Sequence, residues 1–314
     1  MNGYLEYIEK IRRYSPRTVA IYADVLRRYA EFTEPLQGEQ NQRVISPQQL
    51  DIQSLRAYEV HLLDDLGESP RTVALHMSVL GGYCRYLMRK GILSSNPVKL
   101  VSRPKQEKRL PEFFRNEALE SYYESTKGVP EFGNYGQQLS RMVVSMLYNT
   151  GVRRAELISL NRSSLDMSRR TLRVRGKGDK LREIPLTASF CKEISLYLQS
   201  VDSLKDCVTG PEAPLLQTES GGRLYPMLVE RIVKQELGSV GTITSRKSPH
   251  VLRHTLATEL LNDGADLNSI KELLGHSSLA ATQVYTHNSI ERLKSVYNNA
   301  HPRAKNGGKN GNQD

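Results

Sequence analysis

The 314-residue sequence predicts a mainly α-helical protein of two domains, with a small antiparallel sheet in the second. Three observations predict this architecture. Apolar residues recur at helical spacing through most of the chain, and prolines and glycines interrupt them. Residues 165–186 instead alternate apolar and polar side chains, as strands do. Residues 102–112 hold prolines and a basic cluster with little hydrophobic periodicity, which favours a linker.

The first hundred residues predict two pairs of helices. Residues 4–32 form the first pair, broken at Ser15-Pro16, and a polar loop follows at 36–46. The second pair covers residues 47–66 and 70–90, separated by the sequence GESP.

The second part of the chain predicts helices and one hairpin. Residues 116–127 and 136–149 have helical patterns, and TLRVR and LREIPL within 165–186 read as two strands joined by the turn GKGD. From residue 248 onward the pattern is helical again. The last ten residues, 305–314, are polar and rich in Gly and Asn, which predicts a disordered tail.

Composition narrows the class of protein. The formal charge of +10 and the pI of about 9.4 favour a polyanionic partner such as DNA, because phosphates attract Lys and Arg. None of the three cysteines forms a CxxC pair, so neither a disulfide framework nor a zinc site is indicated. No apolar run is long enough for a signal core or a bilayer span. These features predict a cytoplasmic protein.

Two helix starts carry candidate phosphate ligands. In NTGVRRAELISL, Gly151 ends one helix and Arg153 begins the next, with Glu156 placed to brace it across one turn. In SPHVLRHTLATELL, Ser248 suits an N-cap, and His250 and Arg253 share one face near the helix start. The opposite face carries Leu252, Leu256 and Leu260. Taken alone, each pattern also fits an ordinary surface arginine or a solvated polar face.

Two further candidates are weaker by themselves. Gly264 and Gly275 are predicted to end successive helices, and Asp266 to cap the second. His276 follows directly, where a histidine is often only a capping partner. Lys177 lies at the predicted hairpin tip, where lysines usually face solvent. Two helices with this spacing also allow a plain helix-turn-helix DNA-binding function.

Together these residues contain what one reaction needs. A phosphodiester attacked by a side-chain oxygen forms a transition state rich in negative charge, which two arginines and a histidine can bind. A lysine can protonate the leaving 5′-oxygen. Tyr285, nine residues after His276 in GHSSLAATQVYTH, can supply the nucleophilic oxygen.

The ordered set TGVR, GKG, HVLRH, LLGH and Tyr285 resembles the tyrosine recombinases of the phage-integrase family, and most closely the bacterial Xer site-specific recombinases. The N-terminal stretches SPRTVAIYADVLRRY and RPKQEKRLP and the ending AHPRA are similar to the same group. The resemblance covers nearly the whole chain. It implies a SAM-like four-helix-type core-binding domain at 1–101, a linker at 102–112 and a catalytic domain at 113–304.

The resemblance also implies a role for each candidate. Arg153 and Arg253 would bind the scissile phosphate, and His276 would hydrogen-bond it. Lys177 would protonate the leaving 5′-hydroxyl, His250 would assist as acid–base or phosphate ligand, and Glu156 would give support. Tyr285 would be the nucleophile that forms a 3′-phosphotyrosyl link, without metal or other cofactor.

The resemblance further implies partners. The two domains would close around duplex DNA, and a tetramer of this chain, alone or with a paralogous recombinase, would exchange strands through a Holliday junction. Its task would be to resolve chromosome dimers at cell division. A septal DNA translocase acts in Xer systems, and whether one activates this chain stays open. The apolar positions Val296, Tyr297 and Ala300 are expected to dock on a neighbouring protomer, because they have little of their own domain to cover.

Two alternatives stay open. The same chemistry would serve an integrase or excisionase of a mobile element, and the catalytic residues do not separate that role from chromosome maintenance. A DNA-binding regulator that never cuts is the other alternative, although binding alone would not require Tyr285.

Overall fold

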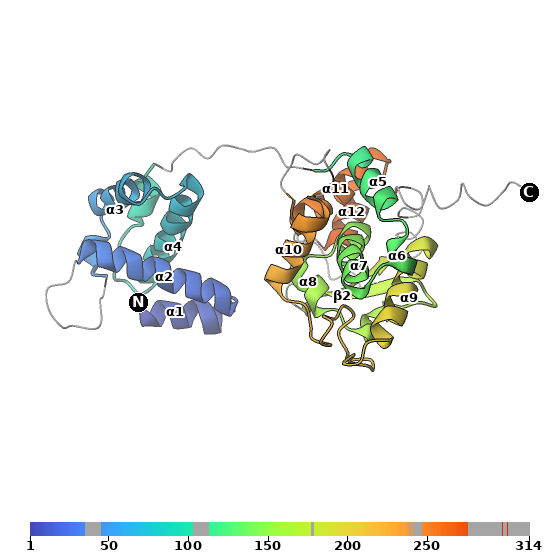
Figure 1. Ribbon diagram of the computed structural model, residues 1–314. Coiled ribbons are helices and arrows are strands. Elements are labelled where there is room, and N and C mark those ends of the chain that lie inside the picture. Colours follow the sequence, from blue (N-terminus) through green and yellow to red (C-terminus); the bar gives the residue numbers. More distant parts are fainter. Residues whose placement is uncertain are drawn as a thin grey trace, which may run out of the picture. The chain divides into compact units, whose positions relative to one another are not determined.

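The computed structural model describes residues 1–34, 45–102, 113–176, 179–238, 240 and 247–275, together with Tyr297 and Ala300. The chain divides into two compact units, Met1–Arg109 and Leu110–Asp314. The described parts are mainly helical with one small antiparallel sheet, so the predicted fold class is confirmed (Figure 1). The predicted tail, most of the loop at 36–46 and all but the first residue of the linker lie outside the described residues.

The first unit is a helical bundle. Its elements are α1 (Asn2–Glu6), a π-helical turn (Tyr7–Ile11), α2 (Pro16–Thr33), a 3₁₀ turn (Pro47–Gln49), α3 (Ile52–Val60), a second π-helical turn (His61–Asp65), α4 (Pro70–Arg89) and a second 3₁₀ turn (Pro97–Leu100). Ser15 and Ser69 cap α2 and α4, each accepting a hydrogen bond from the N–H three residues on, at 3.2 Å. The bundle core includes Tyr29, Tyr58 and Leu80, which are almost fully buried.

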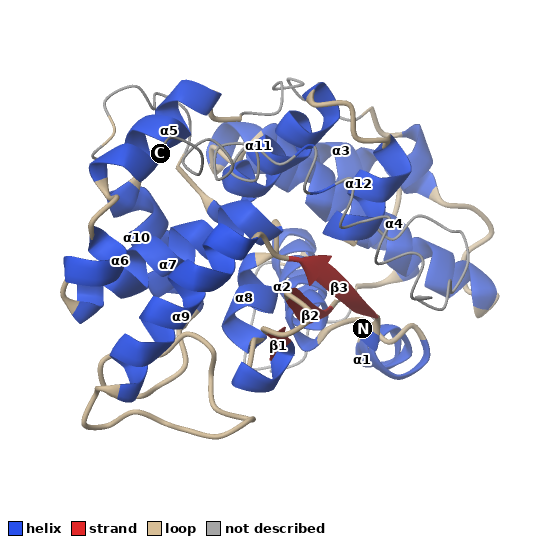
Figure 2. Ribbon diagram, turned by 90° about the vertical axis from the view of Figure 1, so that its right-hand side faces the viewer, coloured by secondary structure: helices blue, strands red, loops and turns tan. Residues whose placement is uncertain are grey.

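The second unit combines helices with a small sheet, whose strand β3 (Leu181–Pro185) contacts α12 (Leu267–Leu274) (Figure 2). Its helices are α5 (Asn116–Ser125), α6 (Val129–Phe132), α7 (Tyr135–Thr150), α8 (Arg154–Ser159), α9 (Ala188–Asp202), α10 (Pro226–Glu236), α11 (Pro249–Asn262) and α12 (Leu267–Leu274), with a 3₁₀ turn at Arg162–Ser164. The central helix α7 is buried along most of its length and contacts α9, α10 and α11. Helices α9 and α10 lie in a stretch for which the sequence pattern made no prediction.

The sheet has the order β1-β2-β3, with β1 (Leu165–Asp166), β2 (Thr171–Arg175) and β3 (Leu181–Pro185) all antiparallel. In the β2–β3 register Leu172 faces Ile184 and Val174 faces Arg182, and all four side chains are buried. Arg182 therefore points a charged group from β3 toward the interior of the unit. This orientation follows from the two-residue period of a strand.

The expectation that Tyr297 and Ala300 have little of their own domain to cover is wrong, whereas docking on a neighbouring protomer stays a prediction. Tyr297 and Ala300 are 1% and 3% exposed within the single chain and belong to the hydrophobic core of their own unit. The Tyr297 hydroxyl donates a hydrogen bond to the Asn149 carbonyl oxygen in the last turn of α7. These two positions are thus covered by their own domain, because α7 offers both apolar contact and a free carbonyl at its end. Val296 lies outside the described residues.

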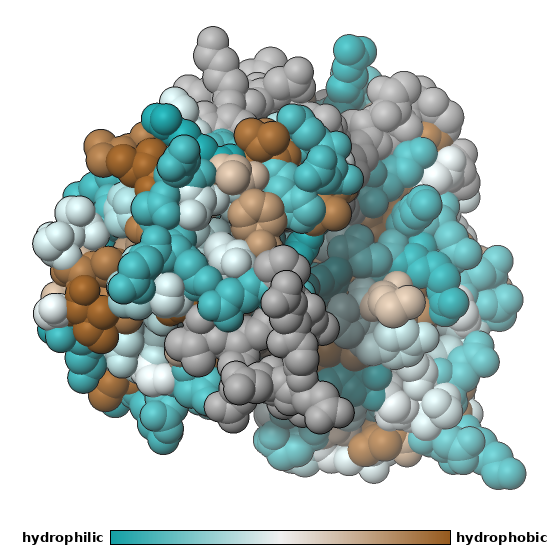
Figure 3. All heavy atoms as spheres, turned by 90° about the vertical axis from the view of Figure 1, so that its left-hand side faces the viewer, coloured by the Kyte–Doolittle hydropathy of each residue, from teal (hydrophilic) through white to brown (hydrophobic). Residues whose placement is uncertain are grey.

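On the face shown in Figure 3, apolar side chains lie in small groups among hydrophilic ones. No helix in the described parts of the chain has the length and apolar character needed to cross a membrane.

Candidate active site

The end of α7 positions Arg153. Gly151 takes the left-handed conformation at φ 60° and donates its N–H to the Leu147 carbonyl at 3.0 Å, which ends the helix as predicted. A Cβ at this position would lie 2.5 Å from Leu274 Cδ2, so α12 approaches the turn where only glycine fits. Arg153 then stands at the N-cap of α8.

Glu156 braces Arg153 as the sequence predicts. Its Oε2 accepts the Arg153 backbone N–H at 2.8 Å, and its Oε1 accepts Arg153 Nη1 at 2.8 Å. The carboxylate thus holds both the main chain and the side chain of the arginine. The Arg153 side chain stays 35% exposed, whereas that of Glu156 is 7% exposed, so the guanidinium is presented to solvent from a buried support.

Arg182 holds the other side of the same carboxylate. Its Nη1 and Nη2 donate to Glu156 Oε1 and Oε2 at 3.0 and 2.8 Å, and its Nε donates to the Leu273 carbonyl at 3.0 Å. Burial alone would raise the pKa of Glu156. The hydrogen bonds and charges of Arg182 and Arg153 outweigh burial and hold that pKa below its ordinary value. Glu156 is therefore a carboxylate at neutral pH.

Three arginines converge on the C-terminus of α12. The consecutive carbonyls of Leu273, Leu274 and Gly275 lie at the C-terminal end of this helix, and each accepts a hydrogen bond from a different guanidinium. These donors are Arg182 Nε at 3.0 Å, Arg253 Nη2 at 2.5 Å and Arg153 Nη2 at 2.9 Å. The negative end of the helix dipole also favours positive charge here. The helix end therefore gathers charges that would otherwise repel one another.

Arg253 reaches this cluster from α11. It is 6% exposed and also donates Nη1 to the Gly151 carbonyl. Burial, and then the nearby charges of Arg153 and Arg182, lower its pKa to about 10, so it stays protonated at neutral pH. Leu252, Leu256 and Leu260 pack the opposite face of α11 in the core, as predicted.

His250 and Arg253 lie on the same helix but in different surroundings. His250 is exposed at the start of α11, while Arg253 is buried. The side chain of His250 is still partly shielded from water. This partial burial, and then the charge of Arg154, lower the pKa of His250, which favours its neutral form at pH 7. Ser248 is the N-cap residue as predicted, but its side chain makes no capping hydrogen bond.

The cluster carries an excess of positive charge. The three guanidinium groups of Arg153, Arg182 and Arg253 face one carboxylate, Glu156, which leaves an excess of two positive charges (three minus one). Each guanidinium has five N–H donors, and Arg153 and Arg253 each use two on described side-chain or carbonyl oxygens. The remaining donors can bind the oxygens of a phosphate.

The structure thus brings Arg153, Glu156 and Arg253 together and places His250 on the same helix as Arg253. Lys177, His276 and Tyr285 lie outside the described residues. His276 directly follows Gly275, whose carbonyl binds Arg153, and Gly275 ends α12 in the left-handed conformation at φ 65° as predicted. Asp266 caps the start of the same helix, accepting the N–H groups of Asn268 and Ser269 at 3.0 and 2.9 Å.

Sequence reasoning missed Arg182. A signal was present, because Arg182 shares the strand parity of Ile184 and thus the buried face of LREIPL. A charged residue at a buried strand position needs an opposite charge. The identity of its partner, Glu156, could not be read from the spacing.

Comparison with known proteins identifies the family of this chain. Residues 116–292 match the model of the phage integrase family, and residues 1–91 match the phage integrase N-terminal SAM-like domain. The chain belongs to the phage integrase family. The family model covers more than half of the 314 residues, and the tyrosine recombinases named in the next comparisons align over almost all of them.

This recombinase is similar to several proteins named tyrosine recombinase XerC. It is 34% identical to that of Chlorobaculum parvum over 97% of this chain and 94% of the relative. It is 37% identical to that of Bacillus licheniformis over 97% and 96%, and 34% identical to that of Bacillus subtilis over 96% and 95%. The chain is therefore a tyrosine-type site-specific DNA recombinase.

Solved structures share the fold of the recombinase. The XerH recombinase bound to a palindromic difH substrate, a post-cleavage complex, matches with a TM-score of 0.66 at 23% identity, over 92% of this chain and 82% of that one. The Tn1549 transposon integrase in complex with a circular intermediate DNA matches with a TM-score of 0.65 at 17% identity, over 92% and 96%.

Proposed function

We propose that this recombinase cuts duplex DNA by attack of the Tyr285 hydroxyl oxygen on a scissile phosphate. The new bond joins that oxygen to phosphorus, the bond from phosphorus to the 5′-oxygen breaks, and Lys177 gives the leaving oxygen a proton. The 3′-phosphotyrosyl ester keeps the energy of the broken bond, so rejoining needs no nucleotide cofactor. A 5′-hydroxyl from a partner strand then reverses the reaction and yields a Holliday junction.

The observation that carries this proposal is the arginine cluster on the end of α12. It supplies an excess of positive charge to an anionic transition state, and its groups are held in place before substrate arrives. Arg153 and Arg253 are the phosphate ligands in this mechanism, with His276 as a further donor. His250, favoured as a neutral imidazole, is suited to accept the tyrosyl proton or to hydrogen-bond the phosphate.

The same proposal extends to partners and role. The functional unit on DNA is a tetramer of this chain, alone or with a paralogous recombinase, and a septal DNA translocase activates it. Its similarity to XerC proteins favours a housekeeping role, the resolution of chromosome dimers at cell division, carried out at the nucleoid in the cytoplasm. A mobile-element recombinase would instead act at sites carried by foreign DNA. Mapping the chromosomal sequence bound in cells separates these roles.

The chemical step is tested with a nicked duplex that traps the covalent intermediate. Wild type should form an adduct that survives a denaturing gel, in the presence of excess EDTA as well as without it. Tyr285→Phe should keep DNA binding and form no adduct, because only the hydroxyl is lost. Tyr225→Phe, which changes an exposed tyrosine at the start of α10, is the matched control and should form the adduct. An adduct formed by Tyr285→Phe would reject the assignment.

A further inference from the structure

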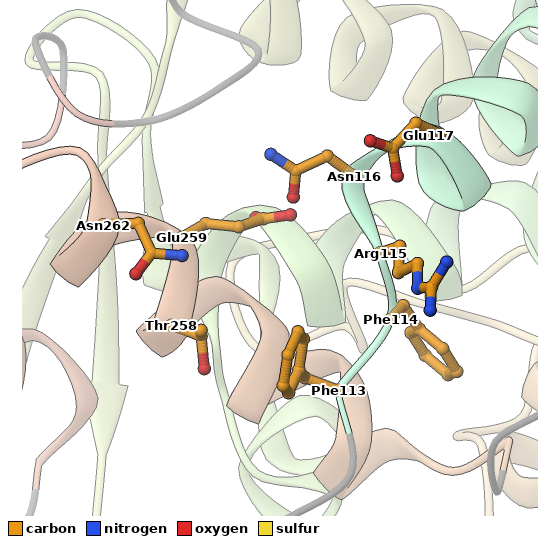
Figure 4. A pocket seen from close by; sticks show the side chains of 8 residues that line it. All are labelled: Phe113, Phe114, Arg115, Asn116, Glu117, Thr258, Glu259 and Asn262. Atoms are coloured by element: carbon orange, nitrogen blue, oxygen red, sulfur yellow. The ribbon is translucent and has the colours of Figure 1, made fainter.

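A cavity of about 260 Å³ lies between the start of α5 and the last turn of α11 (Figure 4). Its lining includes Phe113, Asn116 and Glu117 from the segment that enters α5, and Thr258, Glu259 and Asn262 from α11. All of these residues belong to the second unit, and none is part of the arginine cluster. The mechanism proposed above makes no use of this cavity.

One buried carboxylate in the cavity is incompletely paired. Glu259 is 4% exposed, and its Oε2 accepts the Tyr148 hydroxyl at 2.7 Å. Its Oε1 is buried and has no hydrogen-bond partner among the described residues. Figure 4 shows the carboxylate reaching from α11 across the cavity toward the segment that carries Asn116. A buried charged oxygen without a partner is costly, so this group calls for a donor that the described chain does not supply.

The charges around Glu259 favour a cation as that donor. Glu117 lines the cavity, and Glu120 and Asp263 are close enough to raise the pKa of Glu259 further. Among the described lining residues Arg115 is the one cation, and Figure 4 shows its side chain extending away from Glu259. On a chain of net charge +10, this concentration of acidic groups repels DNA phosphate and attracts a positive group.

The other lining groups suit the stem and head of a basic side chain. The Phe113 ring is 51% exposed and offers apolar and cation–π contact. The Asn116 and Asn262 carboxamides and the Thr258 hydroxyl offer further oxygen acceptors. The cavity lies below the usual size of small-molecule pockets, roughly 300–1,000 Å³, which favours one inserted side chain over a larger ligand.

We propose that this cavity receives a lysine or arginine side chain of a polypeptide partner, with Glu259 as the ion-pairing group. The partner's ammonium or guanidinium would donate to the unpaired Glu259 Oε1, and its methylene stem would lie against Phe113. The surface is then a protein-docking site distinct from the DNA-binding cluster.

The protonation of Glu259 makes the proposal measurable. Burial, with the nearby carboxylates of Asp263 and Glu120, raises its pKa to about 7 despite the Tyr148 hydrogen bond. A cation binds the ionised form, so binding should strengthen as pH rises. Between pH 6 and pH 8 the ionised fraction changes by about tenfold for a pKa of about 7, and the affinity should change by a similar factor.

The test uses calorimetric titration of the full chain with short capped peptides. Peptides with a central Lys or Arg should bind about tenfold more tightly at pH 8 than at pH 6, and should release protons at pH 6 and 7. The same peptide with acetyl-lysine, which lacks the charge, should bind at least tenfold more weakly. Glu259→Gln should abolish the pH dependence and most of the affinity. Glu131→Gln, at an exposed glutamate of α6, is the matched control and should behave as wild type.

Four outcomes would overturn the proposal. If the acetylated peptide binds as tightly as the lysine peptide, the site recognises apolar surface and not charge. Equal binding by Glu259→Gln, with an unchanged fold by circular dichroism, would remove Glu259 from the site. Tight binding of the free diamine putrescine, equal to that of the peptides, would replace the polypeptide partner by a small cation. Arg115→Gln removes the one lining cation that could compete with the peptide for Glu259. Absence of peptide binding in both wild type and this variant would also reject the site.

Discussion

The guanidinium of Arg182 and the carboxylate of Glu156 form a buried two-point ion pair, with N–O distances of 3.0 and 2.8 Å. Their side chains are 5% and 7% exposed. The pair joins β3 to the start of α8, and Glu156 in turn holds the backbone and side chain of Arg153. The sheet therefore contributes, through Glu156, to the position of Arg153, the proposed phosphate ligand.

Breaking this pair should destabilise the second unit. Arg182→Met leaves Glu156 with fewer donors in a buried position, and we expect a loss of about 3–5 kcal/mol in the unfolding free energy. The double variant Glu156→Gln, Arg182→Met should recover part of the loss, because no unpaired charge remains. Arg173→Met, which removes a half-exposed arginine of β2, is the control and should change stability by less than about 1 kcal/mol. Denaturant unfolding measures all three, and equal losses for the two arginines would contradict the prediction.

Gly151 should tolerate alanine worse than another left-handed glycine of the same unit. Gly151→Ala forces an alanine into φ 60° and drives its Cβ against Leu274, for an expected loss of roughly 1–3 kcal/mol. Gly264→Ala at φ 88° meets the backbone strain alone, because no atom lies within 4 Å of its Cβ. The difference between the two variants measures the contact with α12. If Gly264→Ala is the more damaging, packing at Gly151 is not the reason for glycine there.

Tyr297 should stabilise its own chain. Tyr297→Phe removes the hydroxyl that binds the buried Asn149 carbonyl and should cost about 1–2 kcal/mol in thermal or denaturant unfolding of the free protein. Tyr225→Phe is exposed and should have almost no effect. An unchanged stability in Tyr297→Phe would mean that this tyrosine has no such role in the isolated chain.

The stability of the second unit should fall as pH rises because of Glu259. Its pKa of about 7 in the folded state lies above its ordinary value of 4.5, so the folded state binds more protons between these two values. Stability contributed by the protonated form is complete below pH 4.5 and is lost as pH rises through about 7. The loss amounts to at most about 3 kcal/mol for this shift.

Glu259→Gln isolates that effect. The variant keeps an acceptor for Tyr148 but cannot ionise, so its stability relative to wild type should grow as pH increases from 4.5 to 8. Paired denaturant unfolding curves at pH 5, 6, 7 and 8 measure the difference and cancel the other titrating groups. A difference that stays constant over this range would show that Glu259 ionises normally.

Lys177 should act on the leaving group if the proposed mechanism holds. Lys177→Ala should slow cleavage of normal DNA far more than cleavage of a substrate with sulfur at the 5′-bridging position, because a thiolate leaves without a proton. Lys180→Ala, at an exposed lysine of the same hairpin, should slow both substrates alike. Equal losses on both substrates for Lys177→Ala would assign it a positioning role instead.

Local chemistry in the sequence determined where some helices begin and end. Asp266 caps a helix, and Gly151 and Gly275 end helices, at the positions that the residue types predict. These outcomes depend on neighbours within a few residues, since a side-chain cap or a positive φ is a property of one turn. The resemblance of the catalytic motifs identified the family for the same reason, because each motif is contiguous.

Only the tertiary structure decided which residues far apart in the sequence form ion pairs and hydrogen bonds with one another. Glu156 pairs with Arg182, and three arginines bind three carbonyls at the end of α12. Glu259 and Tyr297 are buried by elements far from them in the sequence. Burial determines how much an ion costs and how strongly it interacts with a partner, and burial depends on which elements pack together. A residue pattern can show that Arg182 faces inward, but the fold alone supplies the carboxylate that it meets.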